Sequence, residues 1–201
     1  TKWTPGLVSL VGHLIFDGEI KETGCIYNNR SSALIEKVAR EMRRIYNFPP
    51  KEYRNMETGV SRISYHNIGL GALVQQKSRE LLEKIERFPL ALQKSFLKAF
   101  FDDEGCMDFR PKKSTRKIRG YQKDTKILHL IQKLLSNTGI PSRIELPNEV
   151  VIVGKENLLA FQRRVGFSAG IKMNGLRSNS RWKKNIEKRS LLKRAIASYQ
   201  S

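Results

Sequence analysis

The chain has 201 residues, with 38 Lys and Arg against 19 Asp and Glu, which gives a formal net charge of +19. A hydrophobic content of 39% excludes a disordered chain, and no apolar run reaches the roughly 18 residues that a membrane span needs. The positive charge favours a polyanionic partner, nucleic acid first, over a membrane surface or a merely soluble basic protein.

The first half of the sequence predicts alternating helices and strands. Thr4 can cap a helix whose first position is Pro5 and whose apolar run continues to Phe16. The pattern then predicts, in order, a strand in residues 19–29, an amphipathic helix in 31–48 that ends at two prolines, short strands in 51–59 and 60–67, and a helix in 68–88 that breaks once near its middle.

The second half repeats this order. It predicts an apolar helix in residues 89–105, a hairpin from 106–110 and 116–123, a helix in 124–139 capped by Asp124, a hairpin in 142–154, and a helix in 155–167. The repetition predicts an α+β fold of tandem, pseudo-two-fold αββαββα repeats with two antiparallel four-stranded sheets. We assign 1–88 to the first repeat, 89–171 to the second and 172–201 to a basic helical extension. The alternative is a single irregular α+β domain.

The two cysteines, Cys25 and Cys106, are too few for a disulfide framework. They predict buried thiols in an intracellular protein. The apolar N-terminal stretch lacks a small-residue cleavage site, so we expect a protein that is not secreted.

Two carboxylates stand at the ends of apolar helices: Asp17 in "FDG" and Glu104 in "DEG". The helix dipole disfavours each by up to about 1 kcal/mol. A bound divalent cation would turn this unfavourable interaction into a favourable one. Carboxylates together with helix-end carbonyls form an all-oxygen site suited to Mg²⁺. Gly12 and Ala99, each five residues before its acid, are small enough to let the two helices pack together and bring the acids close. Two ordinary solvated carboxylates are the alternative.

The stretches "LVGHLIFDG" (10–18) and "LKAFFDDEG" (97–105) resemble the two copies of the LAGLIDADG motif of homing endonucleases. The resemblance spans essentially the whole chain and is similar to the single-chain type of archaeal intron-encoded enzymes. It implies a monomeric pseudo-dimer whose two sheets form a saddle for double-stranded DNA. It also implies Mg²⁺, or another divalent cation such as Mn²⁺, and a staggered double-strand break with 3′ overhangs that promotes intron mobility.

The resemblance assigns metal-binding roles to residues in both motifs. Asp17 and Glu104 match the metal-binding acids, and the backbone carbonyls of Phe16 and Asp103 match positions that face the metals. Moving the second alignment by one residue would give Asp103 the role of Glu104. We prefer Glu104, because a glycine follows it directly, as one follows Asp17.

The resemblance also implies catalytic residues where the second strand of each repeat ends. In the second repeat these are Gln122 and Lys123, which would order a water molecule and balance charge. Asn29 and Arg30 stand at the corresponding place in the first repeat, which leaves the symmetry of the two cleavage sites open. Lys155 is a weak candidate for a further lysine of this kind.

Cations on the outward faces of the strands are the candidate DNA contacts. Residues 110–123 hold seven Lys or Arg and no acid, with a loop suited to phosphates and a strand suited to base edges. The candidates are Lys21, Arg62, Arg110, Lys112, Lys113, Arg116, Lys117, Arg119 and Arg143. The basic tail from 177 to 194 either braces DNA or packs as an amphipathic helix through Ile186, Leu191, Leu192 and Ile196.

Several other interpretations stay open. The termini lack the splicing residues of an intein, so the chain would be free-standing or only an endonuclease part. An intron RNA maturase or a DNA-binding regulator could use the same fold, whereas a generic basic RNA-binding protein leaves the paired acids unexplained. We expect Asp102 and Asp108 to be surface acids or groups behind the metal ligands. His13 and His129 show no ligand spacing and should be packed or partly exposed.

Overall fold

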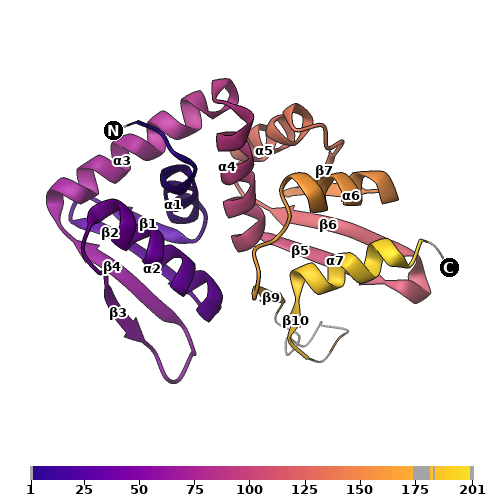
Figure 1. Ribbon diagram of the computed structural model, residues 1–201, viewed down its shortest axis with the longest axis horizontal. Helices are drawn as coiled ribbons and strands as arrows, with labels where there is room; N and C mark the ends of the chain where they lie inside the picture. Colours follow the sequence, from indigo (N-terminus) through magenta and orange to yellow (C-terminus); the bar gives the residue numbers. More distant parts are fainter. Residues whose placement is uncertain (1, 174–181, 183, 200–201) are drawn as a thin grey trace. The chain divides into compact units, whose positions relative to one another are not determined.

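The computed structural model describes residues 2–173, 182 and 184–199, which group into two compact units that divide between Asp103 and Glu104. Each unit contains a four-stranded antiparallel sheet, as predicted from the repeated pattern (Figure 1). Among the described residues, no helix has both the length and the apolar character needed to span a bilayer. The packing boundary lies after the helix of the second motif, whereas the proposed repeat boundary at 88 lies before it.

The first unit contains α1 (Pro5–Phe16), β1 (Gly18–Lys21), β2 (Gly24–Asn29), α2 (Ser32–Tyr46), β3 (Lys51–Arg54), β4 (Ser61–His66), α3 (Ile68–Lys84) and α4 (Leu90–Asp103). Its strands follow the order β1-β2-β4-β3. Helices α1, α2 and α3 contact one face of this sheet (Figure 1). Tyr27 and Ile63 are paired across β2 and β4, point to the helix-covered face and are fully buried. The core of the unit therefore lies between the helices and the sheet.

Local signals explain where several helices begin. The Thr4 hydroxyl accepts a hydrogen bond from the Leu7 N–H at 3.2 Å, and Pro5 begins α1, as predicted. Ser31 occupies the N-cap position of α2, but its side chain makes no capping bond. Helix α2 ends at Tyr46, before the prolines, because Asn47 adopts a left-handed conformation with φ of 59°.

Two expectations about the first unit were wrong. Residues 19–29 form a hairpin rather than one strand, because the chain reverses between Lys21 and Gly24, and Gly24 has a φ of +145° that only glycine adopts readily. Helix α3 is unbroken from Ile68 to Lys84 and tightens into a 3₁₀ turn at Ile85–Arg87. Glycines near its start allow close packing and do not interrupt it.

The second unit contains β5 (Gly105–Arg110), β6 (Thr115–Tyr121), α5 (Thr125–Asn137), β7 (Arg143–Glu145), β8 (Glu149–Val153), α6 (Lys155–Arg164), β9 (Lys172–Met173), β10 (Ile186–Glu187) and α7 (Lys188–Ala197). Its larger sheet has the order β5-β6-β8-β7, which matches the first sheet position by position. The carboxylate of Asp124 caps α5 by accepting from the N–H groups of Lys126 and Ile127, as predicted. The tandem αββαββα fold is confirmed.

The C-terminal extension is less helical than expected. Strands β9 and β10 pair with each other before α7 begins, and residues 174–181 and 183 lie outside the described residues. Leu191 and Leu192 are buried, whereas Ile186 and Ile196 are half-buried. Helix α7 contacts β5 and α6, so its apolar face is part of the core of the second unit. The expected packing of an amphipathic helix is confirmed for Leu191 and Leu192 of α7, whereas Ile186 lies in β10.

Both thiols are free, but only one is fully buried. Cys25 has no exposed surface, and burial raises the pKa of its thiol to about 11. Cys106 is half-buried, and burial also raises the pKa of its thiol. The prediction of buried thiols is therefore confirmed for Cys25 and only partly for Cys106.

Candidate metal and DNA-binding site

Helices α1 and α4 pack tightly within the first unit. A Cβ atom added to Gly12 would lie 3.0 Å from the Cβ of Ala99, so the two small residues meet where the helices cross. The ring of Phe16 packs against those of Phe96 and Phe100, with centroids 5.2 and 5.1 Å away. Small residues at the crossing and aromatic residues beside it hold the two motif helices together.

A chain of polar side chains joins the C-terminal ends of these helices. Asp17 forms the C-cap of α1, and the Asn29 amide at the end of β2 donates to its Oδ2 at 2.5 Å. The same amide lies 3.4 Å from the Tyr27 hydroxyl, which donates to Oδ1 of Asp103 at 2.7 Å. Strand β2 therefore fixes both the acid that ends α1 and the last residue of α4.

The carboxylate of Asp103 is a structural group. Its Oδ2 lies 2.8 Å from Nδ1 of His13, and both side chains are fully buried. Burial first, and then the charge of Asp103, raise the pKa of Tyr27 well above its ordinary value. The Asp103 carboxylate is engaged by His13 and Tyr27, so the alignment that gives it the role of Glu104 is disfavoured.

Of the two roles expected for Asp102, the structure excludes the one as a surface acid. It is 1% exposed and pairs with Lys37 of α2 at 2.9 Å, so it is not a surface acid. The pairing anchors α4 on α2 within the first unit. In the second unit, Asp108 is partly exposed and pairs with Arg110 at 2.7 Å. Neither acid is part of a metal-ligand cluster, because the described residues contain no group of three or more His, Cys, Asp or Glu side chains suited to hold a metal ion.

The same kind of local hydrogen bond forms at the end of β2 and at the end of β6. This similarity supports the alignment of the two repeats. The side-chain oxygen of Asn29 accepts from the N–H of Ser31 at 2.8 Å, and that of Gln122 accepts from the N–H of Asp124 at 3.1 Å. Ser31 and Asp124 are the N-cap residues of α2 and α5. Asn29 and Gln122 therefore occupy equivalent positions, each at a strand end that leads into a helix.

The remaining predicted catalytic residues lie near these strand ends. Glu104 directly precedes β5, is half-buried, and its carbonyl accepts from the N–H of Tyr121 at 3.2 Å. Lys123 is exposed beside Gln122, and Arg30 is exposed with its Nε bonded to the carbonyl of Thr58 at 3.2 Å. Lys155 begins α6, and no feature of the structure assigns it a catalytic role.

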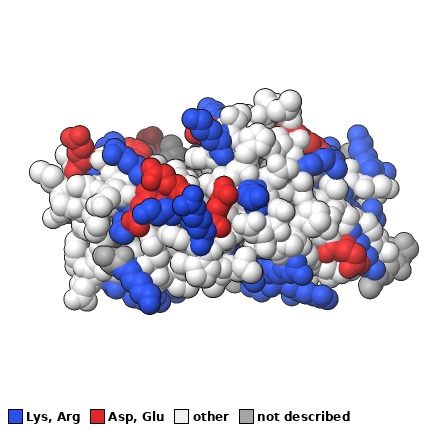
Figure 2. All heavy atoms as spheres, turned by 90° about the horizontal axis from the view of Figure 1, so that it is seen from above, with Lys and Arg blue, Asp and Glu red and all other residues white. Residues whose placement is uncertain are grey.

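In the first unit, two predicted DNA contacts lie on the sheet face opposite the helices. Lys21 is exposed and pairs with Glu19 at 2.7 Å. The Nε of Arg62 donates to Oδ1 of Asn28 at 3.0 Å, and the two residues are paired across β2 and β4. Lys and Arg side chains are also spread, with acids between them, over the molecular face shown in Figure 2.

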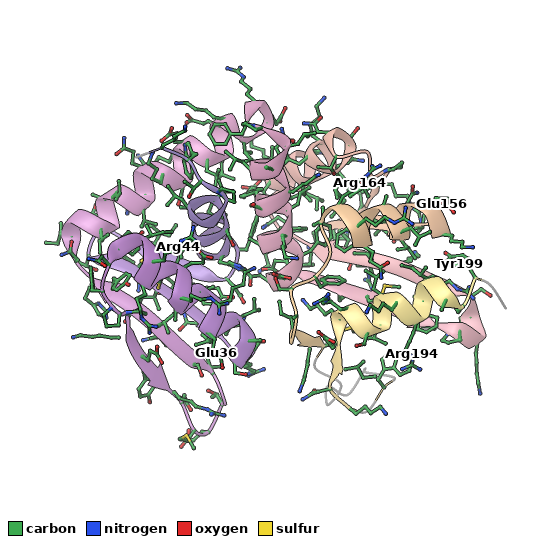
Figure 3. The ribbon with its side chains drawn as sticks, viewed as in Figure 1. Glu36, Arg44, Glu156, Arg164, Arg194 and Tyr199 are labelled. Atoms are coloured by element: carbon green, nitrogen blue, oxygen red, sulfur yellow. The ribbon has the colours of Figure 1, made fainter. Side chains whose placement is uncertain are left out.

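In the second unit, the predicted contacts fall into three groups. Lys112 and Lys113 lie in an exposed 3₁₀ turn between β5 and β6. The Arg116 guanidinium instead bonds the carbonyl and hydroxyl of Ser198 at 2.9 and 2.7 Å and lies over the ring of Tyr199, beyond the end of α7 (Figure 3). The other four lie on the face opposite the helices, which we call the open face of the second sheet: Arg110, Lys117, Arg119 and Arg143.

Three acids lie on this open face, of which Asp108 was expected as a surface acid or a group behind the metal ligands, whereas Glu145 and Glu149 were not foreseen. Asp108, Glu145 and Glu149 each pair with at least one of the four cations. Their alternate positions along β5, β7 and β8 were a usable signal, because residues two apart in a strand share a face. The pairing itself depends on strand order, which brings β6 between β5 and β8.

Comparison with known proteins identifies the class of this fold. Residues 91–166 match a family described as "LAGLIDADG-like domain". A crystal structure of I-DmoI, a homing endonuclease, in complex with DNA and Mn is 19% identical, with a TM-score of 0.60 over 81% of this chain and 97% of that chain. An I-DmoI variant with its target DNA and Mg is 18% identical, with a TM-score of 0.59 over 80% of this chain and 96% of that chain.

A second kind of protein shares the fold. The N-terminal LAGLIDADG domain of DUF199/WhiA is 18% identical, with a TM-score of 0.61 over 82% of this chain and 84% of that chain. A sequence comparison with curated proteins finds no match. The chain therefore has the fold of these LAGLIDADG proteins, and its residues 91–166 match the model of a LAGLIDADG-like domain. The resemblance expected from the two motifs is confirmed, and its archaeal part stays a prediction.

Proposed function

We propose that the chain is a divalent-metal-dependent DNA endonuclease that makes a staggered double-strand break with 3′ overhangs and promotes intron mobility. The observation that carries this proposal is the hydrogen bond from Asn29 to Asp17 at the C-terminal end of α1. A carboxylate at that pole of a helix is disfavoured by the dipole, and β2 nevertheless holds it there. The likeness of the fold to I-DmoI, which is solved with DNA and divalent metals, supports the same function.

The chemical types of the groups at the two motif ends suit a hard divalent cation. Asp17 and Glu104 would supply carboxylates, and the carbonyls of Phe16 and Asp103 would add oxygen donors from the last turns of α1 and α4. The carboxylate of Asp103 is already bonded to His13 and Tyr27, so its carbonyl is the group assigned to the metal. A bound Mg²⁺ or Mn²⁺ would supply Lewis-acid activation of the phosphodiester and of water.

The chain's own polar groups position the reacting partners. Asn29 orients Asp17 from the end of β2, and Gln122 occupies the equivalent place at the end of β6. Lys123 and Arg30 are exposed cations next to these amides, and they would balance the negative charge that builds up on phosphate during hydrolysis. The open sheet faces would bind the double-stranded target on either side of the scissile bonds.

A DNA-binding regulator is the second candidate, and one observation favours it. The first repeat carries Asn29 and Arg30 where the second carries Gln122 and Lys123, and Arg30 is bonded to the carbonyl of Thr58. If Asn29 and Arg30 do not order water as Gln122 and Lys123 would, the first repeat would bind its DNA strand without hydrolysing it. The likeness of the fold to the WhiA domain is consistent with this alternative.

Selection of cleaved DNA tests the two candidates without knowledge of the target. The full chain is incubated with Mg²⁺, or with Mn²⁺, and a plasmid library of long random inserts, and the new ends are captured by ligation and sequenced. The enriched site is then used to compare Asp17→Asn and Glu104→Gln with two charge-matched controls, Glu83→Gln on α3 and Glu156→Gln on α6. Both controls are exposed acids away from the helix ends.

The endonuclease predicts staggered cuts with 3′ overhangs. Asp17→Asn and Glu104→Gln should each abolish these cuts while retaining binding of the selected site, and the two controls should cut normally. Equal cleavage by all five proteins would refute the assignment of the acids. Absence of new ends in either metal, together with tight binding of a duplex enriched by a parallel selection for binding, would refute the endonuclease and favour the regulator.

A further inference from the structure

Three arginines on the open face of the second sheet are held in the same way. Arg110 donates from Nε to Oδ1 of Asp108 at 2.7 Å. Arg119 donates from Nε to Oε2 of Glu149 at 2.8 Å, with a second short bond from Nη2 to Oε1 of the same carboxylate. The third pair is Arg143 and Glu145, with Nε and Nη2 bonded to one carboxylate oxygen at 3.1 and 2.6 Å.

Strand register places the three pairs on one surface. Arg119 is paired with Cys106 of β5 and with Val151 of β8, and Val151 is paired in turn with Arg143 of β7. Asp108 lies two residues beyond Cys106, so its side chain is on the same face. The three arginines therefore present their guanidinium groups from three different strands of a single open sheet face.

The pairing fixes each guanidinium through its Nε side. A guanidinium has five N–H donors, so a carboxylate at Nε leaves donors at the terminal nitrogens. The arginine side chains are 35% to 54% exposed, and a ligand that lies on the sheet can reach them. The bond to Glu149 also raises the pKa of Arg119 above its ordinary value. Each arginine is thus a charged, partly immobilised donor that faces outward.

The charge of this face suits base edges better than phosphates. Lys117 pairs with Glu145 at 3.1 Å, so all four cations of the face have a carboxylate partner. Three carboxylates offset most of the positive charge that a phosphate contact would use. On the first sheet, Lys21 also pairs with Glu19, whereas Arg62 is bonded to the neutral amide of Asn28. The open face of the second sheet can therefore donate directional hydrogen bonds, but it has little net positive charge to attract DNA of any sequence.

We propose that Arg110, Arg119 and Arg143 are specificity-determining residues that read guanines in the major groove, and that Asp108, Glu149 and Glu145 position them. Arginine recognises guanine through two hydrogen bonds to O6 and N7. The part of the target bound by this sheet is then rich in G·C pairs. This inference rests on the DNA-binding part of the proposed function and does not depend on cleavage.

Binding selection on random duplex DNA tests the inference. The full chain is used with Mg²⁺ withheld, once in EDTA and once with Ca²⁺, and the bound sequences give the base preference at each position. The variants are Glu149→Gln, which loosens Arg119, and Arg119→Lys, which removes the bidentate donor. Glu156→Gln, an exposed acid on α6 away from the open face, is the charge-matched control (Figure 3).

The wild-type site should contain guanines with a preference of about tenfold or more over the other bases at the contacted positions. Glu149→Gln and Arg119→Lys should reduce the preference at one and the same position to about threefold or less. Glu149→Gln should also bind random DNA more tightly than the wild type, and Glu156→Gln should leave every preference unchanged. Circular dichroism of each variant should match that of the wild type.

Three results would overturn the inference: absence of guanines from the selected site, loss of preference at two unrelated positions in the two variants, or a uniform change of affinity for all sequences. The last result would make the ion pairs purely structural. A protein that selects guanines and never cuts refutes the endonuclease alone. A protein that cuts without a guanine preference refutes this inference alone, and one that binds no DNA refutes both.

Discussion

Replacing Asp103 by alanine should destabilise the first unit more than any substitution of an exposed acid. The change removes the carboxylate that bonds the Tyr27 hydroxyl at 2.7 Å and Nδ1 of His13 at 2.8 Å. The Nε2 atom of His13 is buried and has no hydrogen-bond partner among the described residues. The variant therefore leaves an imidazole with both nitrogens unpaired, together with a buried hydroxyl that has lost its acceptor.

The size of the effect follows from these two bonds. A hydrogen bond to a charged group contributes about 1.5–3 kcal/mol, so the loss of both should cost about 3–6 kcal/mol. For a unit of about 100 residues, this corresponds to a fall of ~10 °C or more in the midpoint of thermal unfolding.

Tryptophan fluorescence can report on the first unit alone. The chain has two tryptophans, and Trp3 packs on Phe88 and donates to Glu80 within the first unit. A Trp182→Phe background leaves Trp3 as the only tryptophan. Thermal and urea unfolding are then followed at that single site for the background protein and for Asp103→Ala.

Two further variants make the prediction sharp. Tyr27→Phe removes one of the two bonds and should cost about 1.5–3 kcal/mol. Glu83→Ala removes an exposed acid on α3 and should stay within about 0.5 kcal/mol. If Asp103→Ala unfolds within 1 kcal/mol of Glu83→Ala, the buried network does not stabilise the ends of α1 and α4, and the reasoning fails.

Two other predictions concern the first unit. A Cβ added to Gly71 would lie 2.4 Å from the backbone oxygens of Lys21 and Glu22. Gly71→Ala should therefore lower the free energy of unfolding by about 2 kcal/mol or more, despite the better helix propensity of alanine. An unchanged midpoint of urea unfolding, followed by the fluorescence of Trp3, would contradict this. Burial raises the pKa of Cys25 from 9.0 to about 11, so the stability it contributes is complete below pH 9 and is lost as the pH rises to 11. The loss of stability is about 2–3 kcal/mol. Cys25→Ala should therefore make the free energy of urea unfolding depend less on pH between pH 9 and pH 11. An equal pH dependence in the variant and the wild type would refute the role of the Cys25 thiol.

The sequence alone predicted the elements and their repetition with few errors. The caps at Thr4 and Asp124, and most of the alternating stretches, are local signals that depend on neighbouring residues only. The errors were local as well: a hairpin was taken for one strand at Gly24, and a break was expected in α3. In both places glycine allows more than one backbone conformation, and packing against the rest of the unit selects one.

The sequence could not decide the roles of the neighbouring acids. The glycine after Glu104 favoured that residue over Asp103, but only the partners of Asp103 show what its carboxylate contacts. Its carboxylate is bonded to His13, which lies 90 residues away, and to Tyr27, which lies 76 residues away. Asp102, expected either on the surface or behind the metal ligands, is buried against Lys37. A burial state that depends on such distant partners is not visible in a short window of sequence.

The partners of the candidate DNA-binding cations were likewise not predictable from the sequence. Residues 110–123 contain no acid, and the sequence therefore predicted an open row of cations. Strand pairing places Glu149 beside Arg119 on the open face of the second sheet, and it turns Arg116 toward Ser198. Neighbouring cations of one strand therefore contact different parts of the second unit. Alternation along a strand assigns residues to one of two faces, but the identity of the face and of its neighbours follows from sheet order.

The sequence by itself determined that this chain is basic, folded from two αββαββα repeats, and marked by an acid before a glycine at the end of each motif helix. These features follow from composition and from contacts between residues close in the chain. Only the tertiary structure decided that Asn29 holds Asp17, that the Asp103 carboxylate is structural, and that carboxylates clamp the arginines of the second sheet. Those results depend on side chains that become neighbours only when helices and strands pack, because the strength of a polar contact is set by distance and burial.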